Sequence, residues 1–485
     1  MNYLYFKNGV VNAAKWSSLT EVAVRLISPI THMILARVLV PDAFGVVATV
    51  SMIISFADML TDSGFQKYLV QHEFNNEKEK FQYTTVAFWT NLSISILLWV
   101  IITIFSEQIA TMVGNKGLGN VITIAGLQLP LTSFSSIQMA LYKRNFDFKT
   151  LFLVRTISLS LPFVLTIPLA LMGFSYWSLI VGTISGHLFN AIILTYKSKW
   201  KPTFFFNMQF LKEMLSFSIW SLIEAISIWL STWVDTLIIG STLNSYYLGL
   251  YKTSLNIVNA LITIVTASIT PILFSTLSRL QNEDSMFRST FFKVQEIVAY
   301  VIFPIGVGLF IFHDLVTKIM LGEKWTGAGF IIGIWGLTSA IMIVYSDLNS
   351  ECYRAKGMPK LSFALQVIYL LFLIPTCITA LRYGFNTLVY VRTFIRFELM
   401  ITSMLTMQLV LHISIKESLK RTLKPAIFSV AIGFFAFYFM QLRHNMLWNL
   451  ISILLSILVY GFMVRFFARE EFKWILDMLE QKSKI

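Results

Sequence analysis

The chain has 485 residues, of which 56% are hydrophobic and only 13% charged, and its mean hydropathy is +0.70. A soluble domain must turn a polar surface to water, so this composition excludes a soluble protein and indicates a membrane protein. At about 20 apolar residues per spanning helix, the chain could furnish about 12 to 14 helices. Little of it remains for an extramembrane catalytic domain.

Few features of the sequence point to catalysis or to a cofactor. Cys352 and Cys377 lie within or at the edge of apolar runs, which excludes a disulfide framework and a cysteine-based zinc cluster. The first ten residues lack the pattern of a cleavable signal peptide, so we expect the first helix to be retained. The phosphate-binding motif Gly-x-x-x-x-Gly-Lys-Ser/Thr does not occur, so ATP is not expected to drive the protein directly. The sequence therefore predicts no catalytic residue, no metal and no cofactor.

Long apolar runs separated by short polar breaks predict an all-α polytopic membrane protein with about 14 transmembrane helices. In chain order the predicted ranges are 12–38, 41–66, 82–106, 118–141, 149–172, 174–196, 212–240, 245–275, 290–312, 327–352, 360–381, 386–411, 423–441 and 446–467. No loop between them exceeds about twenty residues, which leaves no room for a nucleotide-binding domain.

The net charge of +13 follows the predicted topology. When the lysines and arginines of alternate loops are compared, one side of the membrane carries about four times as many as the other. The positive-inside rule then places both termini in the cytoplasm. The charge is therefore mostly a topology signal, with attraction to anionic lipids as a second effect, and no nucleic-acid partner is predicted.

A weak internal repeat indicates two lobes. Phe44-Gly45-Val46, at the start of the second predicted helix, matches Leu248-Gly249-Leu250, at the start of the eighth, with an offset of 204 residues; chance matching in apolar sequence is the alternative. A repeat of this kind predicts two pseudo-symmetric six-helix lobes around a central cavity that opens to either side in turn. The predicted division is 1–196 for the N-terminal lobe, 197–211 for a cytoplasmic linker, 212–411 for the C-terminal lobe, 412–467 for two extra helices and 468–485 for a cytoplasmic amphipathic tail.

Three runs near the N-terminus carry a family resemblance. They are Leu35-Ala36-Arg37, Pro41-Asp42-Ala43-Phe44-Gly45 and Phe56-Ala57-Asp58-Met59-Leu60-Thr61-Asp62-Ser63-Gly64-Phe65. Together they resemble the opening of the polysaccharide transporter family, the Wzx-type flippases, whose superfamily also holds multidrug and toxic-compound extruders and the lipid II flippase. Helix number, lobe count and length agree with that family over the whole chain.

The resemblance implies a flippase that carries an undecaprenyl-pyrophosphate-linked oligosaccharide, such as an O-antigen, capsule or exopolysaccharide repeat unit, from the cytoplasmic to the periplasmic leaflet of the bacterial inner membrane. It implies transport by alternating access, with no bond made or broken. It also implies membrane lipids as partners, a coupling cation (H⁺ or Na⁺), and the polymerase and chain-length machinery of glycan assembly.

Two other functions stay open at this stage. A multidrug or toxin antiporter of the same superfamily usually has twelve helices, so the extra pair argues weakly against it. A membrane polymerase or ligase of O-antigen would carry a large periplasmic loop with catalytic residues. The longest outer loops predicted in this chain, near 106–117 and 312–326, are too short for that role.

Charged residues within the predicted first helix are candidates for a site, because a charge in a spanning helix costs about 2.5–3.5 kcal/mol unless it has a partner or faces a polar cavity. Arg25 falls near mid-membrane, one helical turn from Glu21. Either the two neutralise each other, or Glu21 orients Arg25 to grip a pyrophosphate, which suits a planar guanidinium. Pro29, one turn further, is a candidate hinge, with simple packing as the alternative.

Two further pairs match in depth. Lys252 and Asp235 fall at similar depths on adjacent predicted helices, which favours a structural ion pair. Arg155 and Asp58 likewise match near the inner side, where either an ion pair or exposure to the cavity is expected.

Arg392 and Arg396 lie one turn apart on one helix face, a like-charge stripe that a purely structural role explains poorly. Glu224 has no basic neighbour in its own helix, so it is a candidate for a protonatable or cation-binding group, with a hydrogen bond to a nearby Ser or Trp as the alternative. The predicted substrate-binding residues are thus Arg25, Arg155, Lys252, Arg392 and Arg396, and the predicted coupling or charge-orienting residues are Glu21, Asp58, Glu224 and Asp235.

Overall fold

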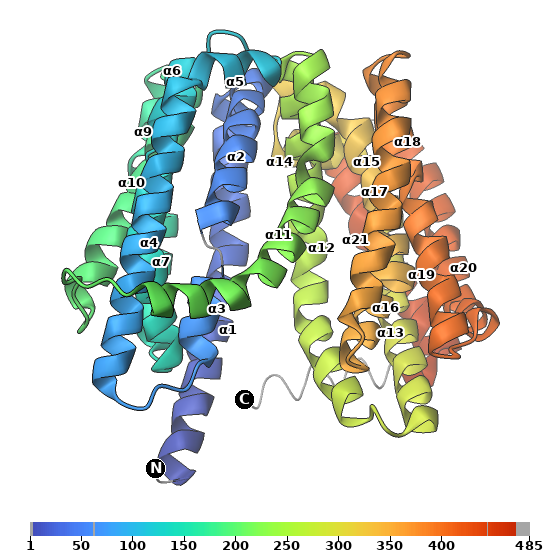
Figure 1. Cartoon of the computed structure of the whole chain (residues 1–485). Coiled ribbons are helices and arrows are strands. Elements are labelled where there is room, and N and C mark those ends of the chain that lie inside the picture. The colour runs from blue at the N-terminus through green and yellow to red at the C-terminus, as the bar shows by residue number, and fades with distance from the viewer. Residues whose placement is uncertain (1–2, 62–63, 444, 472–485) are drawn as a thin grey trace. The chain divides into compact units, whose positions relative to one another are not determined.

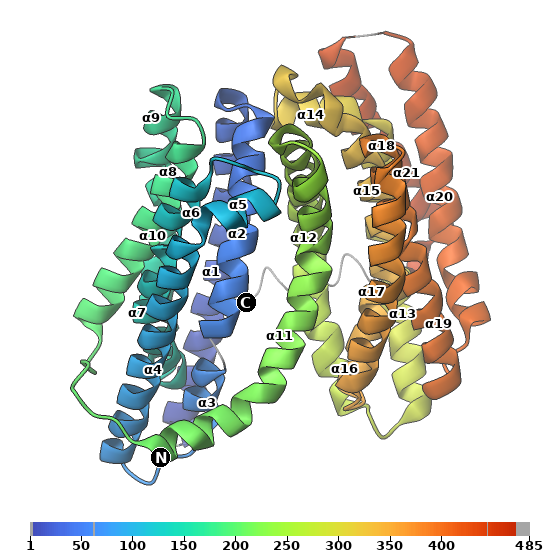
Figure 2. The ribbon, with the colours of Figure 1, turned by 45° about the horizontal axis from the view of Figure 1, so that its top comes forward.

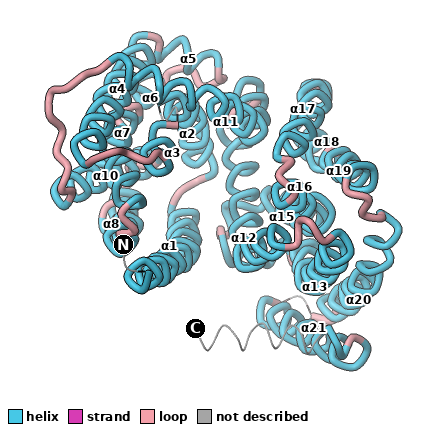
Figure 3. The backbone as a smooth tube through the Cα atoms, turned by 60° about the horizontal axis from the view of Figure 1, so that its bottom comes forward, coloured by secondary structure: helices cyan, strands magenta, loops and turns pink. Residues whose placement is uncertain are grey.

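The computed structural model describes residues 3–61, 64–443 and 445–471. Within these ranges it does not describe the side chains of residues 3–15, 18, 21–22, 25–26, 216–224, 268 and 359. The described residues form helices joined by short loops (Figure 3). The predicted amphipathic tail lies largely in 472–485, outside the described residues, and stays a prediction.

The contacts between helices divide the chain into two units, Met1–Lys252 and Thr253–Ile485, which we call the N-unit and the C-unit. In chain order the helices that begin in the N-unit are α1 (Tyr3–Val38), α2 (Pro41–Thr61), α3 (Phe65–Gln71), α4 (Glu77–Ile104), α5 (Ser106–Met112), α6 (Gly119–Ala125), α7 (Gln128–Arg144), α8 (Phe148–Val164), α9 (Thr166–Leu171), α10 (Tyr176–Lys197), α11 (Met208–Thr242) and α12 (Ser245–Arg279) (Figure 1).

The C-unit takes the rest of α12 and the helices that follow it. These are α13 (Asp284–Ile311), α14 (His313–Met320), the short 3₁₀ helix η1 (Glu323–Ala328), α15 (Gly329–Met342), the π-helical turn η2 (Ile343–Asp347), α16 (Leu348–Ala355), α17 (Pro359–Leu381), α18 (Phe385–Phe394), α19 (Arg396–Val410), α20 (Ile415–Gln441) and α21 (Met446–Phe467) (Figure 1). Its core is built on α13, which packs against both α15 and α20.

The protein is a multi-pass helical membrane protein, as the composition predicts. Each of the fourteen predicted ranges overlaps a helix, and ten helices among the described residues are long and apolar enough to cross a membrane. The count of fourteen is not confirmed, because the ranges 12–38, 118–141, 212–240 and 386–411 fall outside those ten. In two of these ranges the regular helical hydrogen bonding is interrupted, at Gly126–Leu127 between α6 and α7 and at Ile395 between α18 and α19, although these residues keep helical backbone angles. Each of the two apolar runs is thereby divided into two shorter helices.

Polar caps explain where several spanning helices begin. The side chain of Asn76 accepts the backbone N–H of Glu79 at 2.8 Å and starts α4, and Asn445 accepts that of Trp448 at 2.7 Å and starts α21. Ser414 caps α20 in the same way, so this helix starts eight residues before the predicted 423. Each cap satisfies a backbone donor that the first turn of a helix leaves free.

The N-unit extends beyond the predicted N-terminal lobe, because α11 and the start of α12 pack onto its helices. Figures 1 and 2 show that α11 bends, so that its first turns run across the neighbouring helices and its later turns run along them. It contacts α2, α3 and α4. The boundary between the units therefore falls within α12 instead of in the linker 197–211, and the predicted lobe boundaries stay a prediction.

Two glycines allow α2 and α12 to approach closely within the N-unit. A Cβ atom on Gly45 would lie 1.8 Å from the carbonyl oxygen of Ser245, and one on Gly249 would lie 1.9 Å from that of Pro41. The two contacts are reciprocal, since the offset of 204 residues that relates Gly45 to Gly249 in the predicted repeat also relates Pro41 to Ser245. Ser245 also donates a hydrogen bond to Asp42 Oδ1 at 2.9 Å. The start of α2 and the start of α12 thus meet as a two-fold-related pair would.

Candidate substrate-binding site

The N-unit encloses a polar cavity of about 710 Å³ lined by side chains of α1, α2, α7, α8, α9 and α10. Two cations face it, Lys143 at the end of α7 and Arg155 on α8, and both are exposed. Neither side chain makes an ion pair or a hydrogen bond with any residue that the structure describes. The predicted pairing of Arg155 with Asp58 is therefore not formed, and the alternative, exposure of Arg155 to a cavity, is what the structure has.

Hydroxyl, amide and imidazole groups share the rest of the lining with apolar side chains such as Leu35, Phe44 and Met139. The Ser158 hydroxyl donates to Asn190 Oδ1 at 2.6 Å, and the Thr132 hydroxyl lies 3.3 Å from Nδ1 of His187. Groups of this kind can exchange hydrogen bonds with the hydroxyls of a sugar, and the two cations can bind an anion. The cavity can therefore hold a ligand that is both polar and negatively charged.

Three predicted site residues lie on α1, which packs along α8. Pro29 lies inside this one continuous helix. The side chains of Glu21 and Arg25 are outside the described residues, so their roles stay predictions. Thr20 and His32 of the same helix do line the cavity, which places α1 in its wall.

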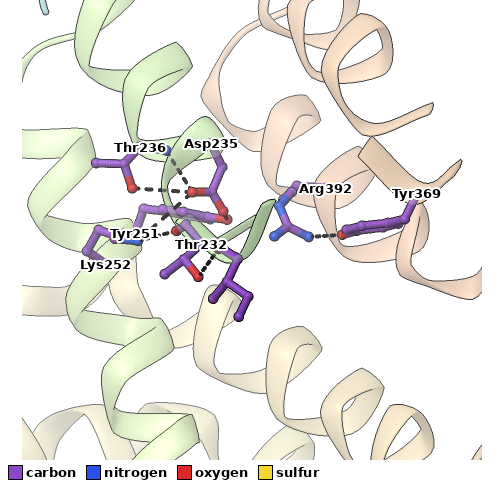
Figure 4. Close-up of polar contacts among 8 residues, drawn as sticks. Thr232, Asp235, Thr236, Tyr251, Lys252, Tyr369 and Arg392 are labelled. Carbon is purple, nitrogen blue, oxygen red and sulfur yellow. Dashed lines mark hydrogen bonds and ion pairs between the residues drawn. The ribbon is translucent and has the colours of Figure 1, made fainter. Parts of the chain in front are cut away.

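Asp235 and Lys252 form the ion pair that their matching depth predicts, with the Lys252 Nζ 3.9 Å from Asp235 Oδ1 (Figure 4). Asp235 is buried, and it also accepts hydrogen bonds from the Tyr251 hydroxyl at 2.7 Å and from the backbone N–H of Thr236 at 2.7 Å. These contacts satisfy the buried carboxylate, as burial of a charge requires.

Lys252 has two further contacts in the N-unit. Its ammonium group donates to the Thr232 carbonyl at 3.1 Å (Figure 4) and lies 4.4 Å from the centre of the Trp233 ring. The Asp235 carboxylate, the Thr232 carbonyl and the Trp233 ring together stabilise the positive charge of Lys252. This geometry favours a structural role for the pair over contact with substrate.

The two arginines of the predicted stripe are held by aromatic and hydroxyl groups of the C-unit. Arg392 is buried, donates to the Tyr369 hydroxyl at 2.5 Å (Figure 4) and lies 5.2 Å from the centre of the Trp335 ring. Arg396 lies 4.2 Å from the same ring and donates to the Ser339 hydroxyl at 2.9 Å. Trp335 therefore stabilises both like charges at once, through cation–π contacts.

Arg396 also lines a smaller cavity of the C-unit, of about 300 Å³, together with Asp347 and Glu351. In the structure Glu351 forms an ion pair with Arg354, and Glu296 lies 4.0 Å from Arg421. Those two acids are thus paired with other arginines.

The remaining predicted acids are Asp58 and Glu224. Asp58 lies half-buried on α2, and the side chain of Glu224, on α11, is outside the described residues. Their roles stay predictions. Lys143, His187 and Tyr369 are not recognisable as site residues from the sequence, since nothing in their local sequence separates them from other loop and helix positions.

The C-unit also carries an apolar groove of about 510 Å³ between α13, α14, α20 and α21. Its lining is aliphatic and aromatic almost throughout, and includes Pro304, Ile432, Gly433, Ile453 and Ile457. A groove of this composition fits a hydrocarbon chain.

The spanning helices, the N-unit cavity and the apolar groove are features expected of a membrane transporter. The chain belongs to the family of polysaccharide biosynthesis proteins, because the sequence model of that family matches residues 34–330, more than half of its length.

Two curated relatives and two solved structures are similar over most of the chain. "Lipopolysaccharide biosynthesis protein WzxC" of Escherichia coli (strain K12) is 23% identical and covers 81% of this chain and 80% of its own. "Succinoglycan biosynthesis transport protein ExoT" of Rhizobium meliloti (strain 1021) is 24% identical and covers 67% and 65%. The lipid II flippase MurJ has a TM-score of 0.78 at 17% identity, covering 94% of this chain and 99% of its own. An inward-facing multidrug transporter of the MATE family has a TM-score of 0.60 at 13% identity, covering 86% and 98%. The two structures show a shared fold.

Proposed function

We propose that this protein is a flippase, which moves an undecaprenyl-pyrophosphate-linked oligosaccharide repeat unit from the cytoplasmic to the periplasmic leaflet of the bacterial inner membrane. It is a transporter and not an enzyme. The observation that carries the proposal is the polar cavity of the N-unit with two cations, Lys143 and Arg155, that have no partner among the described residues. The relatives named for polysaccharide biosynthesis and transport support the class of substrate.

The chemistry of the cavity fits the two polar parts of such a substrate. A guanidinium holds two phosphate oxygens at once and keeps its charge at every physiological pH, so Arg155 is the proposed anchor for the pyrophosphate. Lys143 adds a second positive charge to the same cavity. Asn190, His187 and the hydroxyls beside them offer hydrogen bonds to sugar groups.

The apolar groove of the C-unit has a composition that suits a hydrocarbon chain such as a polyprenyl tail. Arg25, Arg392 and Arg396 are further proposed contacts for the anionic head group. Coupling to H⁺ or Na⁺ through Asp58 or Glu224, and contact with the polymerase and chain-length machinery, belong to the same proposal.

A cell that lacks this protein tests the proposed class. We expect loss of surface glycan and accumulation of the lipid-linked precursor on the cytoplasmic side, both reversed by the intact gene. The measurements are glycan on the cell surface and lipid-linked precursor in membrane extracts. Normal glycan together with increased sensitivity to toxic compounds would instead favour the multidrug antiporter.

The proposed direction of transport requires a defined topology. A reporter fused after Lys360 is expected to lie in the cytoplasm, and one fused after Lys318 in the periplasm, because the positive-inside rule places the Lys-rich loops inside. Alkaline phosphatase and green fluorescent protein fusions measure this directly. The opposite pattern would contradict both the orientation and the direction of transport derived from it.

A further inference from the structure

A second polar cavity of the N-unit, of about 620 Å³, lies where α4 begins and where α7 and α10 end. It shares no lining residue with the cavity that holds Arg155. Three lysines line it, Lys80 on α4, Lys197 at the last turn of α10, and Lys199 just beyond. The proposed transport function gives this cavity no role.

The acids at this cavity are already occupied. Glu77 forms an ion pair with Lys80 at 2.5 Å. Asp147 caps α8, where its two oxygens accept the backbone N–H of Thr150 at 3.1 Å and the Thr150 hydroxyl at 2.8 Å. Lys197 and Lys199 are exposed, and neither side chain has an ion pair or a hydrogen bond within the described part of the chain. Because the hydrogen-bonded Asp147 carboxylate keeps its charge, the three lysines and two acids of the lining leave a net charge of +1.

The cavity wall also includes a hydrogen-bond donor without an acceptor. Trp200 is 7% exposed, and its indole Nε1 is buried with no hydrogen-bond partner among the described residues. Its ring is fixed by Phe88, with ring centres 5.3 Å apart, and by Phe81 at 6.3 Å. A buried donor left without an acceptor is costly, so a bound ligand with an acceptor oxygen would stabilise this wall.

Exposed aromatic side chains beside this cavity indicate that it lies at the depth of the lipid head groups. Exposed aromatic side chains follow the end of α10, with Tyr196 81% exposed, Phe204 95% and Phe206 57%. The spanning segment Tyr176–Lys197 ends at the cavity. Aromatic side chains beside lysines at the end of a spanning helix are typical of the head-group region of the bilayer.

We propose that this cavity is a binding site for the phosphate of an anionic phospholipid head group. Lys197 and Lys199 bind the phosphate oxygens, and the indole N–H of Trp200 donates to an oxygen of the same lipid. The exposed aromatic residues of the linker lie against its acyl chains. An anionic lipid is the occupant because the charge left uncompensated at the site is positive.

Native mass spectrometry of the purified full chain in detergent tests the site. The protein is titrated with phosphatidylglycerol that carries palmitoyl and oleoyl chains, and the bound lipids are counted. The double variant Lys197→Gln, Lys199→Gln is expected to bind the first lipid about 30-fold more weakly, since each lysine near an anionic head group adds about a factor of five. Trp200→Phe, which keeps the ring and removes the N–H, is expected to weaken the same binding several-fold.

The matched control is Lys416→Gln, Lys420→Gln, which removes the same charge from two exposed positions of α20. Its phosphatidylglycerol affinity should equal that of the unmodified protein. An equal loss of phosphatidylglycerol affinity in both double variants would mean that any two lysines contribute by general electrostatics, which would contradict a specific site. Unchanged affinity in the Lys197/Lys199 variant would overturn it as well, and Trp200→Phe tests the same site independently if that variant folds poorly.

Two competitors distinguish the source of the phosphate. Phosphatidylethanolamine with the same acyl chains is expected to bind at least about tenfold more weakly, because it carries no net charge. Inorganic phosphate at millimolar concentration is expected to leave the lipid bound. Displacement by phosphate would assign the cavity to a free anion, and equal binding of phosphatidylethanolamine would assign it to a zwitterion; either result contradicts the proposal. Since the readout is lipid binding, it stands apart from any failure of the transport proposal.

Discussion

Arg155→Ala is expected to reduce export of the lipid-linked glycan about 10- to 100-fold, since a hydrogen bond to a charged group contributes about 1.5–3 kcal/mol. Arg155 faces the N-unit cavity without a partner among the described residues, so its removal strands no buried charge among the side chains that the structure describes. The variant should therefore insert at normal levels. The measurements are surface glycan, lipid-linked precursor and protein level in the membrane.

Arg155→Lys and Arg382→Ala complete the design. The lysine keeps the charge but loses the planar pair of donors, so partial export is expected. Arg382 is exposed at the end of α17 and lines none of the cavities described above, so its removal should leave export unchanged. Normal export by a well-inserted Arg155→Ala variant would reject Arg155 as the anchor and shift attention to Arg25, Arg392 and Arg396.

Gly249→Ala is expected to destabilise the protein by about 1–3 kcal/mol or more, the usual cost of inserting a methyl group into a packed contact. The added Cβ would lie 1.9 Å from the Pro41 carbonyl oxygen, which belongs to backbone and cannot rotate away. Gly45→Ala should have a similar effect, because its Cβ would lie 1.8 Å from the Ser245 carbonyl oxygen. Thermal unfolding in detergent measures the loss as a lower melting temperature.

Gly461→Ala is the matched control for this close approach. Gly461 lies inside α21, and a Cβ there would meet no atom within 4 Å. Alanine favours a helix over glycine by about 1 kcal/mol, so the control should be neutral or slightly more stable. Melting temperatures of the Gly249 and Gly45 variants equal to that of the control would disprove the tight α2–α12 crossing.

The sequence could predict the helices and one contact between them. Apolar runs placed the spans, because a hydrocarbon core requires long apolar segments whatever their neighbours are. Depth along two adjacent helices predicted the ion pair of Asp235 with Lys252, since the rise per residue is fixed. The offset of 204 residues indicated that Gly45 and Gly249 are equivalent, and the structure shows them in reciprocal contacts.

The sequence could not predict which face of each helix meets its neighbours. In a soluble helix the polar face marks the solvent side, but in a bilayer both the lipid side and the packed side are apolar. Lys143, His187 and Tyr369 therefore gave no signal, although the structure places the first two in the N-unit cavity and the third on Arg392. Likewise the sequence could not say that Trp335 lies between two arginines.

Composition, apolar runs and charge distribution by themselves determined that this is a polytopic helical membrane protein and where its charges lie along the chain. Only the tertiary structure decided which of those charged side chains have a partner. Lys252 is paired with the Asp235 carboxylate, and Arg392 donates to the Tyr369 hydroxyl. The Arg155 side chain instead faces a cavity. The difference arises because a partner comes from another helix, whose rotation about its own axis is set by packing and not by its own sequence pattern.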